Sequence, residues 1–124
     1  YAALSGSPRH REAAEQALAQ CGSVAARDPR FGGWALAVAE AAAAGPLQVA
    51  VVGDDARAAE LAAIARRSAS PGLVVTHGMP DAPGLPLLAH RPLVDGGGAA
   101  YVCRGFVCEA PTTVPEQLRA SLRG

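Results

Sequence analysis

Two cysteines near the carboxyl end of the chain are the residues best suited to carry out chemistry. Cys103 and Cys108 are separated by four residues, in the segment Tyr-Val-Cys-Arg-Gly-Phe-Val-Cys-Glu. Thioredoxin-type redox motifs have two residues between their cysteines and place the attacking thiolate at the start of a helix, so this pair meets neither condition. The favoured interpretation is a buried pair of small apolar side chains, because free cysteine is among the most buried residue types.

A thiol-disulfide couple is the alternative, and it depends on the path of the chain between the two cysteines. On a straight strand, the Cα atoms of Cys103 and Cys108 would lie about 16 Å apart. A disulfide needs them within ~7 Å. Gly105 could turn the chain and bring the thiols together, and Arg104 could lower the pKa of a neighbouring thiol. Cys103 and Cys108 are therefore redox candidates, and the catalytic residues are otherwise unassigned.

The remaining metal-ligating side chains do not form a recognisable site. A structural zinc ion would need two further ligands beside the cysteine pair, and Cys21, His77 and His90 are all distant in the sequence. His10 lies between arginines in a predicted helix, which indicates a solvated surface residue. His77 follows a predicted strand, where ligand sites form in α/β proteins. We predict no metal site.

A phosphate-binding turn is a further possibility, at the end of the apolar run that closes with Gly53. A strand, a glycine and a helix start form the skeleton of such a turn. A dinucleotide fingerprint needs two further glycines, whereas here Asp54 and Asp55 place carboxylates where the phosphate would lie. Ordinary capping of the next helix is the favoured interpretation, and we predict no cofactor.

Composition limits the classes of partner. The chain has 124 residues, enough for one core, and a formal net charge of zero without a basic block, which argues against nucleic acid and anionic membranes. No apolar run approaches the ~18 residues of a membrane span. Three cysteines without a secretory signal favour a reducing compartment, so we predict a cytoplasmic location. The start at Tyr1, without an initiator Met, predicts a fragment of a longer protein.

The amino-terminal third has the pattern of a helical hairpin. Residues 8–21 and 29–44 are predicted helices, because each follows a cap residue, begins with proline and ends at a glycine. The glycines are Gly22 and Gly45. A connection of about six residues between the helices predicts an antiparallel pair. Residues 1–45 are thus predicted to form one unit.

Residues 46–124 are predicted to form an α/β module. Three apolar runs predict strands, one helix follows Asp54 or Asp55, and a capping box starts a terminal helix. The predicted strands are 47–52, 73–76 and 99–103, and the capping box runs from Thr113 to Glu116. A long loop over residues 77–98 is predicted to contain one turn near residues 85–89. The fold class is α/β: a helical hairpin followed by a small three-stranded, mainly parallel sheet with flanking helices.

The cysteine segment also resembles part of a known family. The run Cys-x4-Cys-x2-Pro from Cys103, the Pro115-Glu116 pair, the upstream strand and the Leu85-Pro-Leu-Leu segment resemble the carboxyl-terminal end of certain thioredoxin-domain-containing proteins. These are the proteins related to spermatogenesis-associated protein 20. In that family a thioredoxin-like domain precedes a six-hairpin α/α toroid similar to glycosidases, and a small α/β segment closes the chain. The resemblance implies that residues 1–45 are the end of the toroid.

The resemblance implies a structural function for this chain. It predicts a non-catalytic carboxyl-terminal module whose partner is the remainder of the parent chain, the toroid and the thioredoxin-like domain. Enzymatic activity is not expected in the fragment itself, and the activity of the parent is undefined. The alternative is a redox module in which Cys103 and Cys108 exchange electrons with the thioredoxin-like domain.

Overall fold

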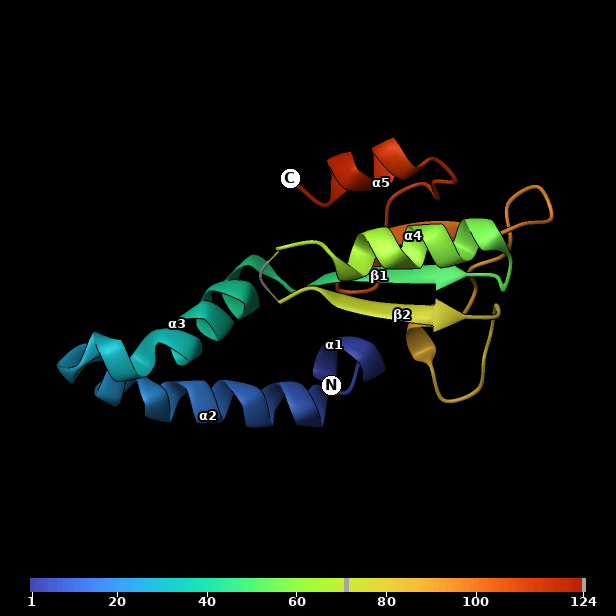
Figure 1. The fold of residues 1–124 in the computed structure, drawn as a ribbon. Helices are drawn as coiled ribbons and strands as arrows, with labels where there is room; N and C mark the ends of the chain where they lie inside the picture. Colours follow the sequence, from blue (N-terminus) through green and yellow to red (C-terminus); the bar gives the residue numbers. More distant parts are fainter. Residues whose placement is uncertain (71, 124) are drawn as a thin grey trace.

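A four-stranded sheet is the centre of the fold in the computed structural model, which describes residues 1–70 and 72–123 (Figure 1). The central strand β1 (Leu47–Val52) pairs in parallel with β2 (Val74–Gly78) and antiparallel with β3 (Ala99–Arg104). A short strand β4 (Val107–Cys108) pairs antiparallel with β3 at the edge. The strand order is therefore β2-β1-β3-β4.

The predicted α/β class is confirmed, but the predicted sheet of three mainly parallel strands was wrong in strand number and direction. The segment after β2 contains no helix that crosses the sheet. It returns to the carboxyl end of β1, where Val52 pairs with Ala99. Because β3 starts at that end, it must run back antiparallel to β1. The fourth strand, β4, follows a tight turn at Gly105 and Phe106, and the predicted strand 99–103 ended before that turn.

One face of the sheet is covered by α4 (Ala56–Arg66) and α5 (Pro115–Ser121), as Figure 1 shows. Alanine dominates the face of α4 that meets the sheet, so the helix backbone can approach the strands closely. The buried residues of this layer are Leu47, Val49, Val51, Ala58, Leu61, Ala62, Ala65, Ala100, Val102, Leu118 and Leu122.

The opposite face of the sheet is covered by α1 (Ala2–Ser5) and by the 3-10 turn η1 (Pro86–Leu88), both on the far side of the strands from α4 in Figure 1. The turn predicted near residues 85–89 is thus confirmed. The buried residues of this layer are Ala50, Val52, Leu87, Leu88, Ala99, Tyr101 and Cys103, with Phe106 and Cys108 packed against them. The second layer therefore contains both cysteines of interest.

The helical hairpin consists of α2 (Pro8–Arg27) and α3 (Pro29–Ala44), which fold back on each other and project away from the sheet (Figure 1). The prediction that the first helix ends at Gly22 was wrong, since α2 continues to Arg27 and only Asp28 separates the helices. Gly22 faces open space, and a mid-helix glycine costs only about 1 kcal/mol relative to alanine. Across the described ranges, no helix combines the length and the apolar character needed to traverse a bilayer.

The start of α5 differs from the predicted capping box. Its N-cap residue is Val114, and no side chain of the predicted box caps the helix. Instead, the Thr112 hydroxyl accepts a hydrogen bond from the Val114 N–H at 3.1 Å, and Glu116 pairs with Arg119 at 3.1 Å. The backbone of Thr112 is bonded to Ala100 of β3, which fixes the chain one residue before Thr113.

The first prediction concerns the core beneath α4. Leu61→Ala removes a side chain with no exposed surface, so we expect a loss of about 2–5 kcal/mol in the free energy of unfolding, measured by urea denaturation followed by circular dichroism. Leu36→Ala is the matched control on α3, where the leucine is 50% exposed, and its expected effect is below about 0.5 kcal/mol. Equal losses for the two variants would contradict the assigned core.

Candidate functional site

A two-residue turn between β3 and β4 brings the two cysteines together. Gly105 and Phe106 have φ angles of 57° and 67°, and positive values at both central residues are typical of a type I′ hairpin turn. The Cα atoms of Cys103 and Cys108 are 3.9 Å apart, and their sulfur atoms are bonded at 2.13 Å. The chain turns at Gly105, as a disulfide between Cys103 and Cys108 requires, and the two cysteines are not a pair of free thiols.

The register of the hairpin explains why the two sulfurs meet on one face. Arg104 pairs with Val107 next to the turn, and the Glu109 N–H donates to the Val102 carbonyl at 2.9 Å on the other side. The cysteines occupy the position between these pairs, which carries no backbone hydrogen bonds of its own. Side chains at such positions are the closest across an antiparallel pair.

Contacts from distant parts of the chain support the unusual backbone of Phe106. Its N–H donates to the side-chain oxygen of Gln48 at 2.9 Å, and the amide nitrogen of Gln48 donates to the Ala3 carbonyl. Gln48 is 1% exposed, so these bonds are made in the interior. A Cβ atom at Gly6 would lie 3.2 Å from the Phe106 ring, so the glycine leaves room for it. Both α1 and β1 therefore hold the turn in place.

A buried arginine lies against both sulfur atoms. The Nη2 atom of Arg91 is 2.9 Å from the Cys108 sulfur and 3.7 Å from the Cys103 sulfur. Its Nη1 atom donates to the Ala89 carbonyl at 2.7 Å. Arg91 is only 7% exposed, and burial lowers the pKa of its guanidinium, which still carries its charge at neutral pH.

The charge of Arg91 has no acidic partner among the described residues. The ion pairs of the described residues join Arg30 to Asp28 and Arg119 to Glu116. The Arg91 Nε atom is buried and, within the same residues, makes no hydrogen bond. A buried cation without a counter-ion is unfavourable, so this site is arranged to favour a negative group near the sulfurs.

A cavity of about 500 Å³ opens beside this cluster. Cys108 lines it and is half-buried, whereas Cys103 is 2% exposed. Tyr101 also lines the cavity; its hydroxyl donates to the Pro92 carbonyl at 2.8 Å, and burial raises the pKa of its phenol. The full lining is Pro86, Ala89, His90, Arg91, Tyr101, Phe106, Cys108 and Glu109.

Arg104 does not take the role that its place beside Cys103 suggested. Its Nη1 atom donates to the Gly45 carbonyl at 2.9 Å, and its side chain is exposed. Neighbouring residues of a strand point to opposite faces, so Arg104 and Cys103 are on different sides of β3. Arg91 occupies the position instead. It comes from the long loop before β3, where the sequence has no periodicity that would indicate the direction of a side chain.

The other predicted polar residues are dispersed over the fold, except for His90 at the cavity. Cys21 is an exposed free thiol, and His10 contacts the Ser7 hydroxyl at 2.8 Å. His77 Nε2 lies 3.0 Å from the Gly53 carbonyl, a contact that joins β2 to the end of β1. In the two described ranges, no group of three or more His, Cys, Asp or Glu side chains is arranged to hold a metal ion.

The acidic turn after β1 is a helix cap, as predicted. The Asp55 carboxylate accepts hydrogen bonds from the Ala58 N–H at 2.7 Å and the Gly98 N–H at 2.9 Å. These two backbone bonds lower the pKa of Asp55. A Cβ atom at Gly98 would lie 2.5 Å from that of Ala58, so the loop packs directly on the helix start. The place of a bound phosphate is thus filled by the protein itself.

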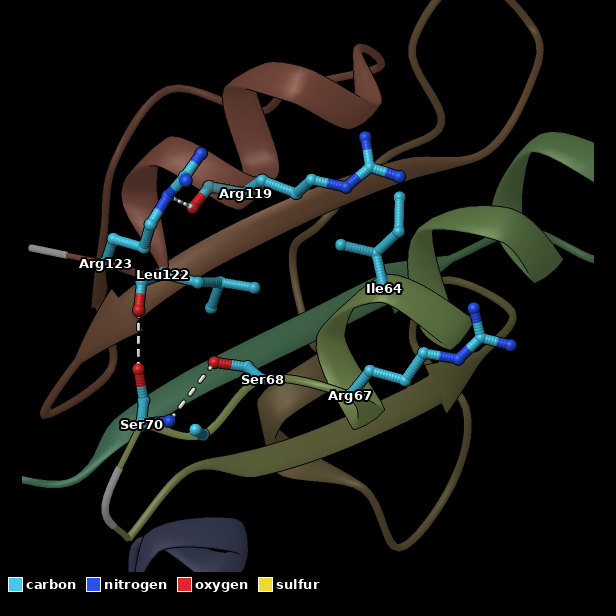
Figure 2. A pocket seen from close by; sticks show the side chains of 8 residues that line it. Ile64, Arg67, Ser68, Ser70, Arg119, Leu122 and Arg123 are labelled. Carbon is cyan, nitrogen blue, oxygen red and sulfur yellow. Dashed lines mark hydrogen bonds between the residues drawn. The ribbon is translucent and has the colours of Figure 1, made fainter.

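A second cavity of about 510 Å³ lies between the end of α4 and α5 (Figure 2). Three arginines line it, but Figure 2 shows their guanidinium groups pointing apart, with no common point for an anion. Its serines are hydrogen-bonded within the protein: the Ser70 hydroxyl donates to the Leu122 carbonyl, and the Ser70 N–H donates to the Ser68 hydroxyl. The arginines are Arg67, Arg119 and Arg123. We assign no ligand to this cavity.

The cysteine and arginine cluster is therefore the best candidate site of the chain. A disulfide beside a buried cation and an open cavity is suited to thiol-disulfide exchange, because the cation stabilises the thiolates that reduction forms. Comparisons with protein families, with curated proteins and with solved structures found no match for this chain.

The second prediction concerns the support of the turn. Gln48→Leu keeps the approximate volume but leaves the Phe106 N–H and the Ala3 carbonyl without their partner, so we expect a loss of about 1–3 kcal/mol in stability. Hydrogen exchange at the Phe106 amide should become faster, measured by NMR. Gln16→Leu, on the exposed surface of α2, is the control and should change neither quantity. Unchanged exchange at Phe106 in the Gln48 variant would contradict the proposed support.

Proposed function

We propose that Cys103 and Cys108 form a reversible thiol-disulfide couple and that the chain exchanges electrons with an external dithiol. The observation that carries this proposal is the juxtaposition of the two sulfurs across the hairpin, with one cysteine at an open cavity and the other buried. A purely structural pair of small apolar residues would need neither the cavity nor the adjacent guanidinium.

The exchange proceeds in two steps. A thiolate of the external dithiol attacks the Cys108 sulfur, the bond between the two protein sulfurs breaks, and the Cys103 sulfur leaves with the electron pair. The second thiolate of the dithiol then attacks the dithiol sulfur that is bonded to Cys108 in the mixed disulfide. The Cys108 sulfur leaves as a thiolate. The protein gains two electrons and, on protonation of both thiolates, two protons, and the external dithiol becomes a disulfide.

A reducing compartment is compatible with this function. Disulfides of cytosolic proteins are usually transient and serve catalysis or redox sensing. Under this proposal the chain works in the cytoplasm, and the resemblance to thioredoxin-domain-containing proteins supplies a suitable dithiol, the thioredoxin-like domain of the parent chain.

The third prediction tests the couple. The chain carrying Cys21→Ser is equilibrated in glutathione buffers of graded potential, free thiols are alkylated, and the products are counted by mass spectrometry. We expect the two remaining thiols to appear and disappear together, as a two-electron couple, while the chain stays folded. Cys108→Ser in the same background should abolish the transition. Two free thiols in every buffer, or a bridge that is reduced only after unfolding, would contradict the proposal.

A second candidate function is a non-catalytic carboxyl-terminal module of a thioredoxin-domain-containing, six-hairpin glycosidase-like protein. The observation that favours it is the apolar surface of the helical hairpin. On α3, Trp34 is 87% exposed and Phe31 is 74% exposed. Large exposed apolar surfaces mark interaction sites, and the remainder of the parent chain is the proposed partner. The two functions are compatible, since the cysteine site is on another part of the fold.

The fourth prediction tests this second function. If the α3 surface normally packs against another part of a parent protein, the isolated chain should self-associate at high concentration, measured by sedimentation velocity. Trp34→Glu should reduce the association, and Arg66→Glu, an exposed change on α4, should not. A monodisperse monomer at all concentrations, with a sharp cooperative melt, would argue strongly against the module.

A further inference from the structure

We infer that Arg91 is the residue that stabilises the Cys108 thiolate and makes Cys108 the sulfur that exchanges with the substrate dithiol. This inference rests on the proposed thiol-disulfide function and assigns the roles of the residues in it. Cys108 is the sulfur that the substrate dithiol attacks and, in the reduced protein, the thiolate that attacks a disulfide in the reverse reaction. Cys103 is the resolving cysteine, and Arg91 contacts both sulfurs.

The first argument is the state of the Arg91 charge. Arg91 is 7% exposed, and its guanidinium has no acidic partner among the described residues. While the disulfide is intact, the sulfurs are neutral and leave this charge without compensation. Reduction creates thiolates within contact distance of it. The ion pair that Arg91 lacks in the oxidised protein is thus formed on reduction.

The second argument is the difference between the two sulfurs. Cys108 is closer to Arg91 Nη2, at 2.9 Å against 3.7 Å for Cys103. Cys108 also lines the cavity, whereas Cys103 is almost completely buried. The thiol that a substrate can reach is therefore the thiol that the cation stabilises more strongly. These are the properties of the attacking cysteine in an exchange pair.

The neighbouring titratable groups do not offer a competing explanation. His90, Tyr101 and Glu109 also line the cavity, but within the described residues none of their side chains is hydrogen-bonded to either sulfur, and Tyr101 meets the Cys103 sulfur only through its backbone carbonyl, at 3.7 Å. The Tyr101 hydroxyl is bonded to Pro92, and the Glu109 carboxylate accepts a bond from Ser121 at 3.2 Å. Arg91 is the cation in contact with the sulfurs.

The fifth prediction measures the effect of Arg91 on the thiol. In the full chain carrying Cys21→Ser and Cys103→Ser, the rate of Cys108 alkylation by iodoacetamide is recorded across pH. We expect an inflection below the value of ~8.5 for a free cysteine. Arg91→Gln should raise it by about one unit or more, which is a tenfold loss of thiolate at pH values below the inflection. Arg91→Lys keeps the charge and should restore part of the shift.

The matched control is Arg104→Gln, which removes the same charge from a residue that contacts Gly45 instead of the sulfurs. Its profile should equal that of the parent chain. If Arg91→Gln leaves the profile unchanged while the cysteine pair still cycles in glutathione buffers, the role of Arg91 is overturned and the proposed function stands. If the pair does not cycle with Arg91 intact, the proposed function itself fails. Circular dichroism identifies a variant that does not fold. If Arg91→Gln does not fold, the pH profile of Cys108 alkylation in Arg91→Lys is compared with that of the parent chain, and an unchanged profile overturns the role of Arg91.

Discussion

The turn at Gly105 and Phe106 is the constraint on which the candidate site depends. With two residues in the turn, the register of the hairpin places Cys103 opposite Cys108, whereas a shift by one residue would move one sulfur to the other face of the sheet. Phe106 is an aromatic residue with a positive φ, which is unfavourable by itself. The buried amide of Gln48 and the space above Gly6 stabilise it, so α1 and β1 take part in forming a site at the opposite end of the chain.

The contact of Arg91 with both sulfurs is the basis for proposing a redox function for this hairpin. A cross-strand cysteine pair alone is compatible with a static bridge. A buried guanidinium beside the pair favours the reduced form over the disulfide, because a thiolate would compensate its charge and a disulfide does not. The loop that carries Arg91 is attached to the sheet by the hydrogen bond from the Tyr101 hydroxyl to the Pro92 carbonyl, which lies next to Arg91 in the sequence.

Local sequence signals predicted the parts of the fold that depend on local interactions. The strand 47–52, the helix capped by Asp55 and the turn near residue 86 all follow from such signals. The direction of β3, the strand β4 and the contact of Arg91 with the sulfurs depend on how distant segments meet, and no spacing in the sequence encodes that. Cys103 and Cys108 were identified as candidates, but the arginine was assigned to Arg104, because adjacency in sequence says nothing about which face of a strand a residue occupies.

Peptide mapping of the native, unreduced chain tests the central claim most directly. Free thiols are alkylated, and trypsin then cuts the hairpin after Arg104, between the two cysteines. We expect the peptide that ends at Arg104 to remain joined by a disulfide to the peptide that begins at Gly105, with Cys21 alkylated. Full alkylation of Cys103 and Cys108 in the air-oxidised chain, or a bridge from either of them to Cys21, would contradict the hairpin and the site built on it.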